Sequence, residues 1–248
     1  MNFTVIQHDW SNVHYAPLNE SYYKQIDLVV TSPPYKDSDG YSEDTMRRVF
    51  YECWYTMKDN ALMFVNMGYL QEDFHRPFRT AALIEKIGFQ PRETFIWVKN
   101  HYKPLGGRKR VNNLYEFIFM FSKGDDFELN RLAVGIPYKD KTNVRRFAGG
   151  KDIKCAGNVW YINYPTIQRS GEKVHHDMFP VELPTRCIKL AGVRNGLVFD
   201  PFLGSGTTGE AAAYTGNSFL GVDREEKWVN YAKNRLQSCY TRYEALYH

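Results

Sequence analysis

Residues 197–208 have the sequence LVFDPFLGSGTT, which is the most informative segment of the chain for predicting its fold. Its three leading apolar residues are typical of the end of a buried strand, and an aspartate follows them directly. Gly204 and Gly206 lack a Cβ, so the backbone can approach a ligand closely there. The residues from 206 to 214 then predict a helix. A strand, a glycine loop and a helix in this order are typical of a nucleotide site at the carboxyl edge of an open α/β sheet.

The glycine loop differs from two common phosphate-binding motifs. It lacks the Gly-Lys-Ser/Thr ending of a P-loop, and it does not complete a GxGxxG pattern. Asp223 ends the next apolar run, 23 residues after Asp200. An acidic residue at about this distance can accept hydrogen bonds from ribose hydroxyl groups. The two strand-end aspartates therefore favour a cofactor that contains adenosine.

Apolar periodicity extends the alternation of strands and helices along the chain. Alternating elements of this kind predict a mostly parallel sheet that is covered by helices on both faces. Between residue 124 and about residue 174 the periodicity fades, which indicates an irregular insertion. Strands are predicted at 3–7, 26–31, 61–67, 94–98, 115–121, 197–199 and 218–222, and helices at 43–58, 72–86, 180–191, 206–214 and 225–237.

Length and composition narrow the class of protein. The 248 residues suit one large α/β domain with a small insertion. No N-terminal apolar signal core and no apolar run of membrane-spanning length is present, so we expect a cytoplasmic protein without a membrane partner. The cysteines have no paired spacing, so we predict no disulfide framework and no metal site. They are Cys53, Cys155, Cys187 and Cys239.

Positive charge is concentrated in one part of the chain. The whole sequence has a net charge of +4, but residues 100–175 contain 14 Lys or Arg and only 7 Asp or Glu. The rest of the chain is slightly acidic. A polyanion that is bound through its phosphates would explain this distribution, and a solvated basic loop is the alternative.

A second informative segment follows the predicted strand at 26–31. Residues 31–35 have the sequence TSPPY, in which two prolines stiffen the backbone and remove two N–H donors. The Ser32 hydroxyl and the Pro33 carbonyl can accept the two hydrogens of an exocyclic amine, while Tyr35 offers an aromatic face. This set suits a planar base that has been flipped out of a duplex. An ordinary proline-rich turn is the alternative interpretation.

Together the two segments resemble the motifs of the β class of amino DNA methyltransferases. Residues 31–35 resemble the catalytic motif, and residues 200–208 resemble the loop that binds S-adenosylmethionine. The catalytic motif comes first, which is the permuted order of that class. Residues 176–180, HDMFP, resemble the segment that closes over the methionine part of the cofactor. The resemblance extends over nearly the whole chain.

The resemblance implies a Rossmann-like methyltransferase fold, an α/β fold with circularly permuted motif order. Its sheet is expected to have seven mostly parallel strands with one antiparallel hairpin strand, and helices on both faces. The chain is then expected to divide into a catalytic half at 1–124, a small target-recognition insertion at 125–174 and a cofactor-binding half at 175–248.

The resemblance also implies a role for individual residues. The implied catalytic residues are Ser32, Pro33, Pro34 and Tyr35. The implied cofactor-binding residues are Asp9, His176, Phe179, Pro180, Asp200, Pro201, Phe202, Gly204, Ser205, Gly206, Thr207, Thr208 and Asp223. Arg108, Lys109, Arg110, Arg145 and Arg146 are the candidate contacts to DNA phosphates.

A serine before Pro-Pro-Tyr favours cytosine N4 as the methyl acceptor in this class, and adenine N6 is the alternative. The implied partner is double-stranded DNA, and the expected source is a prokaryote or a phage. A homodimer and a cognate restriction endonuclease are further partners to test. Three other hypotheses stay open: an RNA or protein-amide methyltransferase, a non-catalytic DNA-binding partner and, as the weakest, an NAD-binding enzyme.

Overall fold

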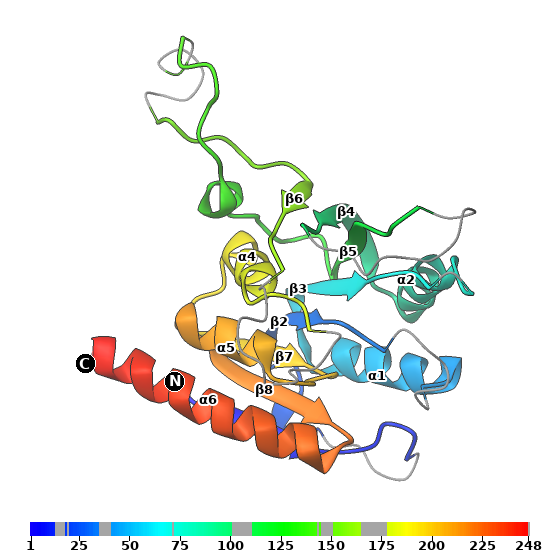
Figure 1. Ribbon diagram of the computed structural model, residues 1–248. Coiled ribbons are helices and arrows are strands. Elements are labelled where there is room, and N and C mark those ends of the chain that lie inside the picture. Colours follow the sequence, from blue (N-terminus) through cyan, green and yellow to red (C-terminus); the bar gives the residue numbers. More distant parts are fainter. Residues whose placement is uncertain are drawn as a thin grey trace.

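The computed structural model describes residues 1–12, 18, 20–34, 41–70, 72–100, 111–142, 144, 151–164 and 178–247. These residues form a twisted sheet with helices packed on both of its faces (Figure 1). The strands are β1 (Phe3–Gln7), β2 (Ile26–Thr31), β3 (Met57–Met67), β4 (Gln90–Val98), β5 (Tyr115–Ser122), β6 (Val159–Tyr161), β7 (Leu197–Asp200) and β8 (Ser218–Asp223). The helices are α1 (Glu43–Thr56), α2 (Arg76–Ile87), α4 (Glu182–Ala191), α5 (Thr207–Tyr214) and α6 (Glu226–Tyr247), with short 3-10 turns η1 (Glu20–Tyr22) and η3 (Arg131–Val134).

The sheet has the strand order β1-β8-β7-β2-β3-β5-β4-β6. Every neighbouring pair is parallel except the two pairs that β5 makes with β3 and β4. This arrangement confirms the mostly parallel α/β sheet and its single antiparallel strand. The expected strand number of seven is one too low, because the insertion supplies β6 as an eighth strand. Trp160 of β6 is buried, and β6 pairs in parallel with the end of β4.

Two helical layers bury the sheet, as Figure 1 shows. Helices α4, α5 and α6 cover one face and contribute Leu183, Ala212 and Leu236 to its core. Helices α1 and α2 cover the other face with side chains such as Phe50 and Ile84. Burial on both faces explains why the centres of β2 and β7, residues 28–30 and 197–199, are continuous apolar runs and show no alternation of polar residues.

Several element boundaries differ from the predicted ones, and tertiary contacts explain the differences. Strand β3 begins at Met57 and not at residue 61, because Met57 pairs with Ile26 of β2. Helix α6 continues ten residues beyond its predicted end. Its extension is fixed where the Tyr240 hydroxyl donates to the Asn217 carbonyl oxygen at 2.9 Å and its ring packs 5.3 Å from that of Phe3.

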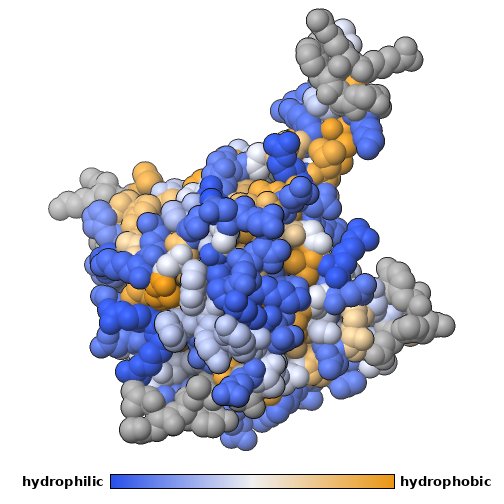
Figure 2. Space-filling model, turned by 180° about the vertical axis from the view of Figure 1, so that it is seen from behind, coloured by the Kyte–Doolittle hydropathy of each residue, from blue (hydrophilic) through white to orange (hydrophobic). Residues whose placement is uncertain are grey.

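The insertion forms an arm that stands away from the sheet in Figures 1 and 2. We define the arm by its described residues, 130–142, 144 and 151–158. Its outgoing and returning segments meet at an isolated antiparallel bridge between Ile136 and Lys154. Lys141 also forms an ion pair with Asp152. Within the described residues, no helix is both long enough and apolar enough to cross a membrane.

Candidate active site

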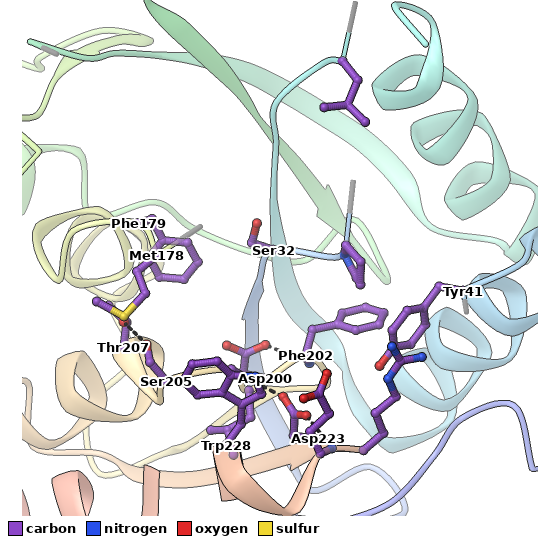
Figure 3. Close-up of a pocket in the computed structure, with 16 residues that line it drawn as sticks. Ser32, Tyr41, Met178, Phe179, Asp200, Phe202, Ser205, Thr207, Asp223 and Trp228 are labelled. Carbon is purple, nitrogen blue, oxygen red and sulfur yellow. Dashed lines mark hydrogen bonds between the residues drawn. The ribbon is translucent and has the colours of Figure 1, made fainter. Parts of the chain in front are cut away.

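A cavity of about 560 Å³ opens at the carboxyl ends of β2, β7 and β8. This size is typical of a pocket for a small molecule or cofactor. Figure 3 shows side chains from both predicted motifs around the same space, with Ser32 above Asp200 and Asp223. The predicted residues that line the cavity are Ser32, Pro34, Phe179, Asp200, Phe202, Gly204, Ser205, Thr207 and Asp223.

Asp200 joins the two motifs. It lies at the end of β7 and is only 2 % exposed. Its Oδ1 accepts hydrogen bonds from the Thr31 hydroxyl at 2.6 Å and from the Phe202 amide at 3.1 Å, while Oδ2 accepts one from the Thr208 hydroxyl at 2.8 Å. Thr31 directly precedes Ser32. We call residues 32–35 the catalytic segment, after their predicted role, and residues 200–208 the glycine loop. One buried carboxylate therefore connects the catalytic segment to the glycine loop across 169 residues of sequence.

The environment of Asp200 opposes its ionisation. Burial raises the pKa of its carboxyl group to about 6, even though the three hydrogen bonds favour the charged form. Both carboxylate oxygens accept from protein donors, so Asp200 lines the cavity but mainly positions the two segments. The sequence suggested that Asp200 contacts the cofactor. The geometry adds a second role, which is to support the two segments.

Asp223 is the second acidic group of the cavity. It ends β8, and its Oδ2 accepts a hydrogen bond from the Gly204 amide at 2.9 Å. Its Oδ1 accepts from the Glu225 amide at the same distance. Burial raises the pKa of Asp223 above its ordinary value. Each carboxylate oxygen has a further lone pair, so the group can also accept hydrogen bonds from ligand hydroxyls.

The glycine loop depends on two residues with left-handed backbone. Gly204 has a φ of +49° and Gly206 a φ of +80°, which L residues with a Cβ rarely adopt. A Cβ on Gly206 would also lie 3.1 Å from the Cβ of Ala232, so the loop packs closely against α6. Gly206 therefore supports the loop from behind, while Gly204 lines the cavity.

The catalytic segment leaves β2 as residues 32–34. Pro33 is buried, whereas Ser32 and Pro34 are partly exposed and line the cavity. A guanidinium N–H of Arg76, the first residue of α2, donates to the Pro34 carbonyl oxygen at 3.4 Å. Arg76 is itself 7 % exposed, so a buried cation lies beside the proline pair.

Other predicted residues support the cavity or lie beside it. Asp9 is exposed after β1, is not among the lining residues, and its Oδ1 accepts from the Ser11 amide at 2.9 Å. The Pro201 carbonyl oxygen accepts a hydrogen bond from the Trp10 indole N–H at 2.9 Å. The buried residues Pro180, Gly206 and Thr208 also lie behind the lining.

Seven predicted residues lie outside the described part of the chain, so the structure does not place them. They are Tyr35, His176, Arg108, Lys109, Arg110, Arg145 and Arg146.

The structure adds lining residues that sequence reasoning missed. Arg224 follows Asp223, and its guanidinium lies 4.8 Å from the centre of the Tyr41 ring. Tyr41 in turn meets Phe202 edge to face at 5.3 Å. Proximity to the strand-end aspartate could have suggested Arg224, but no local signal marks Tyr41, which comes from the start of α1. The added residues outside the predicted motifs are Tyr41, Leu70, Arg224, Glu225 and Trp228. Met178 and Leu203 also line the cavity, and they belong to the predicted segments 176–180 and 200–208.

Comparisons with known proteins show the family to which this chain belongs. A family model described as DNA methylase, for N6 and N4 methyltransferases, matches residues 26–234. The Type II methyltransferase M.BglII of Bacillus subtilis is 26% identical over 227 residues, which cover 84% of this chain and 62% of the relative. The chain thus spans less than two thirds of that relative's length.

Solved structures share the fold. The PvuII DNA methyltransferase, which is cytosine-N4-specific, superposes with a TM-score of 0.72 at 20% identity and covers 98% of this chain and 93% of its own. A DNA modification methylase of Thermus thermophilus, solved with S-adenosyl-L-methionine, has a TM-score of 0.66 at 21% identity and covers 96% and 94%. Because the family model matches most of the sequence, the chain belongs to the DNA methylase family of N6 and N4 amino methyltransferases.

Proposed function

We propose that this protein transfers a methyl group from S-adenosylmethionine to the exocyclic N4 of cytosine in DNA. The observation that carries the proposal is the Thr31–Asp200 hydrogen bond of 2.6 Å. It holds the segment suited to an amine and the loop suited to an adenosyl cofactor at one cavity. Membership of the family supports the same chemistry.

The residues of the cavity fit the cofactor. Asp223 presents a carboxylate for ribose hydroxyls at the end of β8, and Gly204 leaves the backbone accessible beside it. Phe179 and Met178 provide apolar surface at another part of the cavity, as Figure 3 shows. The other proposed cofactor residues are Asp200, Pro201, Phe202, Ser205, Gly206, Thr207 and Thr208 of the glycine loop, with Asp9, His176 and Pro180, of which Asp9 and Pro180 do not line the cavity. When bound, the cofactor supplies a methyl group on a positively charged sulfur, which keeps the electron pair of the broken bond.

The catalytic segment would hold and activate the amine. The Ser32 hydroxyl and the Pro33 carbonyl oxygen accept its two hydrogens, which favours a tetrahedral nitrogen with a localised lone pair. Pro34 and the bond from Arg76 keep the backbone of the segment in place. Tyr35 stacks on the base, and the nitrogen releases one proton to solvent as the new C–N bond forms. Positioning of two substrates is a large part of such catalysis.

The insertion is the proposed target-recognition region, between a catalytic half at 1–124 and a cofactor-binding half at 175–248. Its arm stands away from the sheet, where it could reach along a duplex (Figure 1). The excess of Lys and Arg in residues 100–175 favours phosphate contacts, for which Arg108, Lys109, Arg110, Arg145 and Arg146 are the candidates. The target base would be flipped out to reach the cavity. A second copy of the chain and a cognate endonuclease are the partners to look for in solution.

Nucleoside analysis tests the proposal directly. Duplex DNA is incubated with the protein and methyl-labelled cofactor, digested to nucleosides and separated by chromatography. We expect label in N4-methyldeoxycytidine. Label in N6-methyldeoxyadenosine would replace cytosine with adenine as the acceptor, which the shared family of the two activities makes the second candidate. Absence of label from every DNA tested would overturn the proposal.

A further inference from the structure

Arg235 of α6 contacts the glycine loop although it is far away in sequence. One of its terminal nitrogens, Nη1, donates to the Ser205 carbonyl oxygen at 3.1 Å. The same nitrogen lies 3.3 Å from the hydroxyl oxygens of both Ser205 and Thr207. A single guanidinium therefore contacts the backbone and both hydroxyl groups of the loop.

Glu210 of α5 fixes this guanidinium from its other edge. Its Oε2 accepts from Arg235 Nε at 2.7 Å and from Nη2 as well. The side chains of Arg235 and Glu210 are only 20% and 16% exposed. Because two N–H groups on one edge of the guanidinium donate to the same carboxylate oxygen, that edge is held and Nη1 is aimed at the loop.

The hydroxyl groups of Ser205 and Thr207 have one hydrogen more than their mutual hydrogen bond uses. Arginine is a donor only, so the Ser205 and Thr207 hydroxyl oxygens both act as acceptors toward Arg235. The two oxygens are 3.2 Å apart, which means that one hydroxyl donates to the other. The hydrogen of the second hydroxyl then has no acceptor in the described hydrogen bonds of this pair. Both residues line the cavity, so that hydrogen is available to a ligand.

The cavity therefore has two chemically different parts. Asp223 and Glu225 supply carboxylates, which suit ligand groups that donate. Ser205 and Thr207 supply a hydroxyl donor backed by a cation, which suits an anionic acceptor. Figure 3 places this hydroxyl pair below Met178 and apart from Asp223. A ligand with ribose hydroxyls at one end and a carboxylate at the other would be oriented by this difference.

We propose that Arg235 is a positioning residue of the cofactor site. Its guanidinium polarises the Ser205–Thr207 hydroxyl pair and turns it into a donor for the carboxylate of the cofactor's methionine part. The proposal rests on S-adenosylmethionine as the ligand of the cavity. Arg235 itself touches no ligand in this proposal, and it acts on the cofactor through the glycine loop.

The test compares two ligands that differ by one group. Binding of S-adenosylhomocysteine and of its decarboxylated analogue is measured by isothermal titration calorimetry. The variant is Arg235→Gln combined with Glu210→Gln, so that no buried charge is left unpaired. We expect the dissociation constant of S-adenosylhomocysteine to rise about 10-fold, because the hydroxyl pair loses the cation that orients its donor toward the charged carboxylate and that hydrogen bond is weakened. The dissociation constant of the decarboxylated analogue should change less than about twofold by the same reasoning.

The chain offers a matched control pair. Arg186 and Glu182 form a similar ion pair on α4 and do not line the cavity. The combined change Arg186→Gln and Glu182→Gln should leave both dissociation constants unchanged. A Ser205→Ala plus Thr207→Val variant, which keeps Arg235, should reproduce the selective loss if the hydroxyl pair carries the effect.

Two results would overturn the inference about Arg235 and leave the proposed function standing. One is an equal loss of affinity for both ligands, which would give Arg235 only a structural role. The other is a wild-type protein that binds both ligands equally well. A wild-type protein that binds neither ligand would contradict the proposed cofactor itself, and the inference with it.

Discussion

The glycine loop and the catalytic segment lie at the ends of neighbouring strands, but different forces hold them in place. Side chains from several elements fix the glycine loop. The Asp223 carboxylate accepts a hydrogen bond from the Gly204 amide, while Arg235 and Trp10 donate to the carbonyl oxygens of Ser205 and Pro201. The catalytic segment is stiff through its own prolines and needs fewer contacts, with Thr31 at its base and Arg76 at the Pro34 carbonyl oxygen.

This difference separates the functions of the two regions. A loop held by side chains from several elements can keep the shape of a cofactor site before any ligand is bound. A short proline segment keeps its shape without helix or sheet hydrogen bonds, so it can present the Pro33 carbonyl oxygen to an amine. Substitutions in the glycine loop should therefore change cofactor affinity, and those in the catalytic segment should change turnover. Thr31 and Asp200, which connect the regions, should affect both.

The largest effect is expected at Ser32. The change Ser32→Ala removes an acceptor for the amine, and kcat should fall about 100-fold or more, as for loss of a preorganised polar contact to a reacting group. The dissociation constant of the cofactor should stay within about twofold, since the glycine loop is unchanged. Methyl transfer to DNA and calorimetric cofactor binding measure the two quantities. Retention of full activity would show that the catalytic segment is only a turn.

A pair of threonine variants tests the connection itself. Thr31→Val and Thr208→Val each remove one donor from the same Asp200 carboxylate, at 2.6 Å and 2.8 Å. Each should lower the free energy of unfolding by about 1–3 kcal/mol, because a buried carboxylate loses a hydrogen bond. Only Thr31→Val lies beside Ser32, so only this variant should also lower kcat clearly. Equal kinetic effects of the two variants would argue against a separate role for the catalytic segment.

Gly206→Ala tests whether the glycine loop is held by its backbone. The new Cβ meets left-handed φ and the Ala232 contact, so it should cost about 1–2 kcal/mol in unfolding free energy. We expect cofactor affinity to fall with kcat almost unchanged at saturating cofactor. Gly157→Ala is the control, because its φ of +77° is similar but a Cβ there has nothing within 4 Å. If both variants bind the cofactor equally well, packing against α6 does not shape the loop.

A pH dependence of the free energy of unfolding is also expected, centred on Asp200, whose pKa burial raises to about 6. Between about pH 4 and pH 6 the native protein keeps a proton that the unfolded chain has already lost. The contribution of this group to the free energy of unfolding therefore decreases as pH rises, by about 1.4 kcal/mol per pH unit. Asp200→Asn has no such proton. Urea unfolding of both proteins from pH 4.5 to 7 should show the wild type losing stability relative to the variant up to about pH 6, and a constant difference would contradict the assigned environment.

Local sequence patterns were sufficient to predict the central strands of the sheet. Residues 26–31 and 197–199 are apolar enough to be buried on both faces, and the structure confirms them as β2 and most of β7. The edge of the sheet was harder to predict. Val159, Trp160 and Tyr161 form β6 only because β4 offers them an unpaired edge. Contacts of this kind have no periodic signature in the sequence.

In the site, too, some features could be predicted from local sequence and others depend on tertiary contacts. Both motifs were predicted from residue type and position at strand ends, and the structure brings Ser32, Asp200 and Asp223 to one cavity. Asp9 was assigned by resemblance, yet it does not line that cavity. Arg235 was not predicted, because an arginine on an amphipathic helix is by itself typical of a solvated face.

The sequence by itself determined the chemistry of this protein: which strand ends carry a serine, prolines, glycines and aspartates, and in what order. Those properties depend on residue type and on spacing within short segments, which a sequence displays directly. How the segments support one another became visible in the folded structure alone. Hydrogen bonds such as Thr31 to Asp200 and Arg235 to Ser205 join residues far apart in the chain. Such pairs exist only after the sheet has brought the strand ends together and burial has made each unsatisfied polar group costly.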